Sequence, residues 1–81
     1  MTTKNEIRGW FKEGVKEGAT HMIVMCDTFD YEDYPVFVQK GEDVKAEVSK
    51  RSGKDMQKVM EVYNLSMDME KQMGEYRSFN Y

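Results

Sequence analysis

The fold is decided by one continuous stretch of the sequence, residues 21–39, which reads HMIVMCDTFDYEDYPVFVQ. Its first part, 21–26, is almost entirely apolar and β-branched at its centre, a pattern typical of a strand covered on both faces. Pro35 precedes a second apolar run, 36–39, and proline is accepted at the first position of a strand. The segment 27–35 contains Asp and Pro, which favour turns. Together these features predict an antiparallel hairpin.

A helix is predicted before the hairpin, over residues 3–17. Thr3 and Glu6 form a capping-box pattern, in which the Thr hydroxyl accepts an amide proton and the Glu reaches back. Gly18 is a typical helix stop. The apolar residues follow the spacing of one helical face and predict that Trp10 is buried: Ile7, Trp10, Phe11, Gly14 and Val15.

Further helices are predicted after the hairpin. Asp43 precedes Val44 and Val48, whose spacing of four residues indicates a second helix. Another capping-box pattern, 52–55, comes before a segment with helical spacing, 56–63, whose apolar residues are Met56, Val59, Met60 and Tyr63. Ser66 can cap a last helix through about Tyr76, and that helix can also continue the one before it.

The sequence thus predicts one small α+β domain, residues 1–81, in the order α-β-β-α-α, with the tail 77–81 unassigned. An isolated hairpin is only marginally stable. Helices of the same chain cover one face of it in this scheme, so we expect a homodimer to cover the other. A catalytic cleft between large domains is excluded by the chain length.

Composition and charge limit the function further. The 12 Lys and Arg and 15 Asp and Glu give a net charge of −3, and the excess lies in 21–44, which has six acidic residues and one basic residue. Direct nucleic-acid binding is disfavoured, because it needs clustered Lys and Arg. The longest apolar run, 22–26, is too short to span a membrane. Cys26 is the single cysteine, and the N-terminus lacks an apolar signal core, so we expect a reducing cytoplasm.

An acidic aromatic segment is the candidate site. Aromatic side chains dominate interface hot spots, and carboxylates between them can pair with Arg or Lys of a partner. A metal-dependent hydrolase or nuclease using Asp27, Asp30 and Asp33 is the alternative, and a solvated turn with Phe29 and Tyr34 packed inward is the third. The candidate binding residues are Asp27, Phe29, Asp30, Tyr31, Glu32, Asp33 and Tyr34.

Other motifs assign no catalytic residue, metal site or cofactor. His21 and Cys26 have opposite parity on a strand and therefore face opposite sides, which argues against a shared zinc site or a nucleophilic pair. The phosphate-binding patterns G-x-G-x-x-G and G-x-x-x-x-G-K-[ST] do not occur. The eight methionines are typical of a core or an adaptable interface.

The stretch Gly18–Val36, GATHMIVMCDTFDYEDYPV, resembles the core of a family of small proteins from bacteriophages, prophages and related bacterial genomes. The segments 56–65 and 76–79 are also similar to that family. The resemblance implies an accessory protein made in a bacterial cytoplasm, and it transfers no catalytic or ligand residues.

These observations together predict a non-enzymatic binding protein that blocks or sequesters a host protein, such as a host-defence protein or a host enzyme. Two other functions stay open at this point. One is the metal-dependent hydrolase, and the other is a sponge for a small nucleotide signal with a pocket between subunits.

Overall fold

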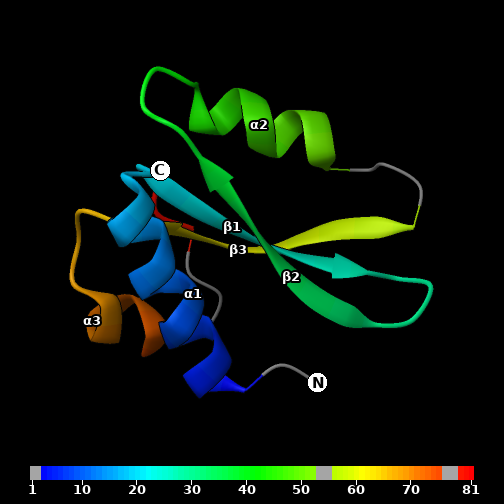
Figure 1. Ribbon diagram of the computed structural model, residues 1–81. Helices are drawn as coiled ribbons and strands as arrows, with labels where there is room; N and C mark the ends of the chain where they lie inside the picture. Colours follow the sequence, from blue (N-terminus) through cyan, green and yellow to red (C-terminus); the bar gives the residue numbers. More distant parts are fainter. Residues whose placement is uncertain (1–2, 53–55, 76–78) are drawn as a thin grey trace.

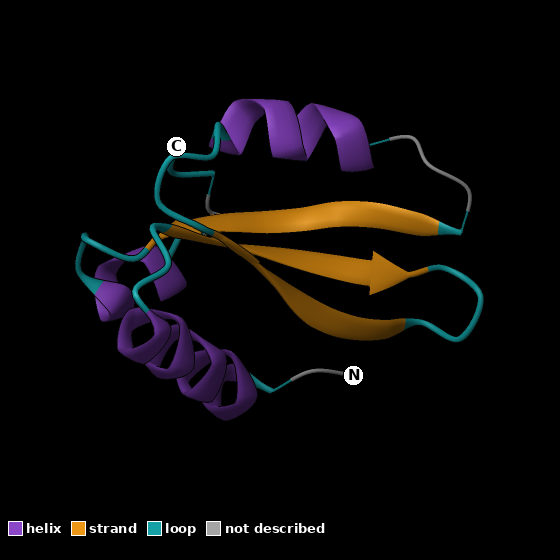
Figure 2. Ribbon diagram, turned by 45° about the horizontal axis from the view of Figure 1, so that its top comes forward, coloured by secondary structure: helices purple, strands orange, loops and turns teal. Residues whose placement is uncertain are grey.

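The computed structural model describes residues 3–52, 56–75 and 79–81. In chain order the elements are α1 (Lys4–Glu17), β1 (His21–Asp27), β2 (Glu32–Val38), α2 (Val44–Arg51), β3 (Gln57–Asn64) and α3 (Met69–Met73). The three strands form one antiparallel sheet in the order β2-β1-β3. Helix α2 lies over one face of the sheet, and α1 and α3 lie over the other (Figures 1 and 2). The α+β class and the antiparallel hairpin are confirmed.

The helix ends follow the local sequence. Thr3 Oγ1 accepts a hydrogen bond from the Glu6 amide at 3.2 Å, as the capping-box pattern predicts. Gly18 ends α1 in the left-handed conformation with φ of 80°, which glycine adopts without a steric penalty. Asp43 caps α2 by accepting from two amides of its first turn. None of the helices among the described residues is long and apolar enough to cross a membrane.

Strand β2 is longer than predicted. It begins at Glu32, opposite Asp27 of β1, so Pro35 lies inside the strand rather than at its start. The position is acceptable because β2 is an edge strand of the sheet. Proline has no amide proton to donate, and on an edge strand this costs no hydrogen bond of the sheet if the proline nitrogen faces away from the neighbouring strand. Proline inside the exposed strand also hinders pairing with another chain.

The helix predicted over 56–63 is wrong, because this segment forms strand β3 and pairs with the free edge of β1. The pairing contains a bulge: Val59 and Glu61 lie opposite consecutive residues of β1, and Met60 between them is the additional residue. The sheet thus gains its third strand from within the chain.

This bulge explains why the spacing was misleading. An additional residue shifts the alternation of a strand, so that residues three apart come to lie on one face. Val59 and Val62 pack on the α2 side of the sheet, whereas Met60 and Tyr63 pack on the α1 side. A spacing of three residues, typical of a helix, arises here from a bulged strand.

The last helix is shorter than predicted. Asp68, not Ser66, caps α3 by accepting from the Lys71 amide at 3.0 Å. The predicted end at Tyr76 and residues 53–55 of the capping-box pattern lie outside the described residues.

Both faces of β1 are covered by the same chain. Met22 and Val24 belong to a core shared with α1 and α3, and Ile23 and Met25 belong to a second core shared with α2. The two-sided burial predicted for this strand is confirmed. A second subunit, which the sequence analysis expected over one face of the hairpin, is not required for this burial.

Helix α1 lies rotated slightly from the expected face. Phe11 and Gly14 are buried, whereas Val15 is 52% exposed and Trp10 is only partly buried at the edge of the core. Gly14 lets the helix pack tightly, because a Cβ atom there would lie 2.8 Å from Leu65 Cδ1.

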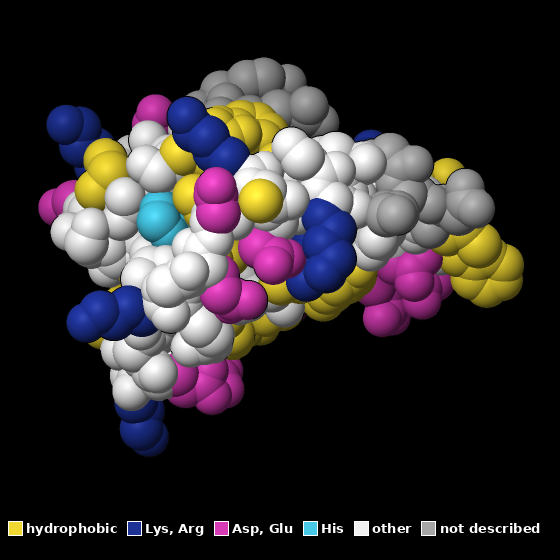
Figure 3. Space-filling view, turned by 90° about the horizontal axis from the view of Figure 1, so that it is seen from above, with side chains coloured by type: hydrophobic (Ala, Val, Ile, Leu, Met, Phe, Trp, Pro, Cys, Tyr) yellow, Lys and Arg dark blue, Asp and Glu magenta, His cyan; other side chains and the backbone are white. Residues whose placement is uncertain are grey.

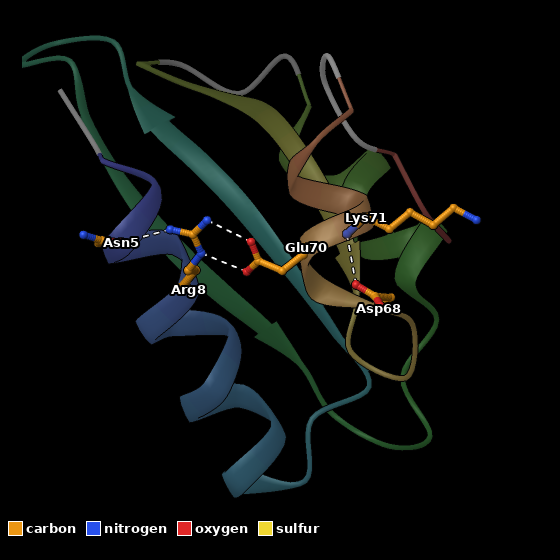
Figure 4. A network of polar contacts seen from close by, with 5 residues as sticks. All are labelled: Asn5, Arg8, Asp68, Glu70 and Lys71. Atoms are coloured by element: carbon orange, nitrogen blue, oxygen red, sulfur yellow. Dashed lines mark hydrogen bonds and ion pairs between the residues drawn. The ribbon is translucent and has the colours of Figure 1, made fainter.

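Two polar connections hold the short helix α3. The Arg8 guanidinium donates two hydrogen bonds of 2.8 Å to the Glu70 carboxylate and one of 2.9 Å to Asn5 Oδ1 (Figure 4). The hydrogen bonds and the negative charge of Glu70 raise the pKa of Arg8, and the hydrogen bonds and the positive charge of Arg8 lower the pKa of Glu70. Gln72, 1% exposed, bonds to both the amide and the carbonyl of Asn64 at the end of β3.

Candidate contact surface at the hairpin tip

The loop between β1 and β2, residues 28–31, is held by local hydrogen bonds. The Tyr31 amide donates to the Asp27 carbonyl at 2.7 Å. Asp27 Oδ1 accepts from the Phe29 amide at 2.8 Å, and Asp30 Oδ1 accepts from the Glu32 amide at 3.1 Å. The side chains of the two aspartates therefore stabilise the conformation of the loop by accepting hydrogen bonds from the backbone amides of Phe29 and Glu32.

Large apolar side chains are exposed at this end of the sheet. Phe29 is 76% exposed and Tyr31 is 72% exposed. Met56, the residue before β3, joins them, because its carbonyl accepts from the Thr28 amide at 2.9 Å and its side chain is 52% exposed. We call this surface the hairpin tip, and its residues are Asp27, Phe29, Asp30, Tyr31, Glu32 and Met56.

The space-filling view shows the same combination of side chains. Hydrophobic and acidic side chains gather at the right-hand end of Figure 3, the end where Figure 1 places the β1–β2 loop. The tip thus combines an apolar surface with negative charge.

Two residues of the tip have an unusual backbone conformation. Tyr31 has φ of 59° and Met56 has φ of 61°, and they are the non-glycine residues with positive φ in the described chain. A side chain in this region costs about 1–2 kcal/mol relative to the right-handed conformation, and glycine avoids this cost. An exposed Tyr and Met at these two positions therefore do not increase the stability of the fold.

The other candidate residues lie away from the tip. Tyr34 packs against the core under α2, and its hydroxyl donates to Gln57 Oε1 at 2.8 Å. Asp33 is half-buried next to Cys26. Burial raises the pKa of the Cys26 thiol, and the hydrogen bond and charge of Asp33 raise it further. The inward packing considered for Phe29 and Tyr34 holds only for Tyr34.

The carboxylates do not converge on a metal position. Among residues 3–52, 56–75 and 79–81, no group of three or more His, Cys, Asp or Glu side chains is arranged to hold a metal ion. Asp27 and Asp30 bond to loop amides, and Asp33 lies farther along β2. The metal-dependent alternative therefore has no supporting cluster in the described chain.

His21 lies at the opposite end of β1 from the tip. The Thr20 hydroxyl donates to the Val38 carbonyl at 3.2 Å, so it accepts from His21 Nδ1, 3.0 Å away. His21 Nε2 then carries the lone pair, and this buried atom has no hydrogen-bond partner among the described residues. Burial lowers the pKa of His21, since a charged ring would have an unsatisfied buried donor.

Comparisons with protein-family models, curated proteins and solved structures found no match to this chain. The site therefore rests on its own geometry. Sequence reasoning missed Met56, which it had placed on a helical core face. The turn-forming composition of 52–55 was a signal that a strand could begin there.

Proposed function

We propose that this chain is a non-enzymatic binding protein whose hairpin tip contacts a basic surface of a target protein. The observation that carries the proposal is the exposure of Phe29, Tyr31 and Met56 at one end of the molecule, two of them on left-handed backbone. Strained, exposed residues that do not stabilise a fold are typical of functional sites.

The chemistry of the tip supports a protein partner. Aromatic side chains provide most of the affinity in protein interfaces, and a rim of charge accelerates association. Asp30 and Glu32 are exposed beside the aromatic residues, so a complementary surface carries Lys or Arg around an apolar centre. Phosphate groups of nucleic acids and nucleotides would be repelled.

The resemblance to phage-type proteins suggests where this target is found. We take it to be a bacterial protein of the cytoplasm, such as a host-defence protein or a host enzyme, which is blocked when the tip occupies its basic surface. The homodimer expected from the sequence is not required for this role, because the tip is exposed in a single chain. Sedimentation of the 9.6 kDa chain tests whether a dimer forms.

Photo-crosslinking tests the proposal. p-Benzoylphenylalanine replaces Phe29 in the full chain, which is irradiated in bacterial lysate, and the products are identified by mass spectrometry. We expect a defined crosslinked protein that disappears when unlabelled wild-type chain is added in excess.

The matched control carries the crosslinker at Glu17, which is exposed at the end of α1, far from the tip along β1. That position should not give the same product. If Phe29 and Glu17 positions give the same crosslinks, or if excess wild-type chain does not compete, the tip is not a specific contact surface.

A further inference from the structure

The hairpin tip contains a shallow, open hollow of about 310 Å³, and the described residues that line it are Asp27, Phe29 and Met56. It is formed where Met56, just before β3, meets the loop between β1 and β2, at the hydrogen bond from the Thr28 amide to the Met56 carbonyl. A phenyl ring and a flexible thioether chain thus line this hollow together with one carboxylate.

Asp27 supplies the negative charge of the hollow. One carboxylate oxygen, Oδ1, accepts from the Phe29 amide, and no hydrogen bond to Oδ2 occurs among the described residues. The surrounding loop adds charge of the same sign, from Asp30 and Glu32. An anion or a nucleic acid phosphate is therefore disfavoured as the occupant.

The apolar lining points to a cation with a long carbon stem. The face of an aromatic ring attracts cations, and the stems of Lys and Arg cover apolar surface while the charged head meets a carboxylate. Arginine fits best, because its planar guanidinium can stack on the ring and still present donors to a carboxylate.

We infer that this hollow receives an arginine side chain of the target protein, an inference that rests on the proposed function. The aliphatic stem lies against Met56, the guanidinium stacks on Phe29, and Asp27 accepts its hydrogen bonds. The tip would then recognise one particular basic residue and not only a positively charged surface.

The probe is Nα-acetyl-arginine amide, and the readout is NMR of the full chain labelled with ¹³C at the methionine methyl groups. The Met56 signal is assigned from the spectrum of a Met56→Leu variant. We expect this signal to shift in a saturable way with the arginine probe, and to shift little with the uncharged citrulline analogue.

Two variants remove one carboxylate each and keep the loop. Asp27→Asn and Asp30→Asn both retain the side-chain oxygen that accepts from the Phe29 and Glu32 amides, respectively. Of these two aspartates, Asp27 is the one that lines the hollow. We expect Asp27→Asn to weaken arginine binding about fivefold, the upper range for an exposed ion pair, and Asp30→Asn to change it less than about twofold.

The inference is overturned if the Met56 signal does not respond, or if the two variants weaken binding equally, since that would indicate general attraction by the acidic loop. A tip-specific crosslink at Phe29 without arginine binding would leave the proposed function standing and reject only the arginine. Absence of both would reject both.

Discussion

Two glycines of the same helix provide a matched test of how α1 packs on the sheet. A Cβ atom at Gly14 would lie 2.8 Å from Leu65 Cδ1 and 2.9 Å from two ring atoms of Phe37, whereas a Cβ at Gly9 would meet nothing within 4 Å. Both positions lie inside the helix. Replacement by alanine therefore raises the helix propensity by the same amount at both positions, but it introduces close contacts only at Gly14.

The two contributions can be separated by comparison. Alanine is favoured over glycine inside a helix by about 1 kcal/mol, so Gly9→Ala should stabilise the chain by up to that amount. At Gly14 the same gain is opposed by overpacking of about 1–3 kcal/mol, because Leu65 and Phe37 must both move. Gly14→Ala should therefore be neutral or destabilising by up to about 2 kcal/mol.

Guanidinium denaturation at equilibrium measures both variants. The difference in free energy of unfolding between them should be about 1–3 kcal/mol, or a separation in Tm of several degrees for a domain of this size. If Gly14→Ala stabilises the chain as much as Gly9→Ala does, then α1 does not pack against the sheet as described.

Three further predictions concern polar side chains. Gln72→Ala should destabilise by about 1–3 kcal/mol in urea denaturation, because it leaves the half-buried amide and carbonyl of Asn64 without the side chain that bonds to both; an effect below about 0.5 kcal/mol would refute that role. Since burial lowers the pKa of His21, its contribution to stability is complete above the unfolded pKa of about 6.5 and is lost as the pH falls towards the folded pKa. Tm of the wild type should thus fall more steeply from pH 7.5 to 5.5 than Tm of His21→Gln. An equal fall of Tm in the two chains would contradict a lowered pKa of His21. The triple variant Asp30→Asn, Glu32→Gln and Asp33→Asn should keep Tm within a few degrees and weaken the salt dependence of target binding without abolishing it, because Asp27 keeps its charge; a large fall in Tm would show that these carboxylates support the fold.

The elements that could be predicted from the sequence are those specified by neighbouring residues. The capping pattern of Thr3 and Glu6, the stop at Gly18 and the cap at Asp43 involve contacts within four residues. The apolar run 21–26 is equally local, since its composition alone indicates a strand buried on both faces.

Strand β3 could not be identified in this way. Its spacing depends on the bulge at Met60, and a bulge forms only when the strand pairs with β1. Met56 joins the tip through a hydrogen bond to Thr28, which is distant in the sequence. Both features are set by pairing across the sheet and not by local pattern.

The candidate site could be predicted only in part, because it too depends on how the strands pair. The composition of 27–34 identifies the segment, but the exposure of each side chain depends on where the strands end. Because the loop covers only 28–31, Tyr31 projects from the tip whereas Tyr34 lies on a strand and packs inward. No sequence pattern distinguishes these two tyrosines.

The central claim is that the tip residues serve contact with a target and not the fold, and Tyr31→Gly tests it most directly. Glycine suits the left-handed backbone at Tyr31, so the free energy of unfolding should stay within about 1 kcal/mol of the wild type. The measurement is competition by this variant against the crosslink formed at Phe29. The account predicts that the folded variant fails to compete at concentrations where the wild type competes fully, and equal competition by the two chains would contradict it.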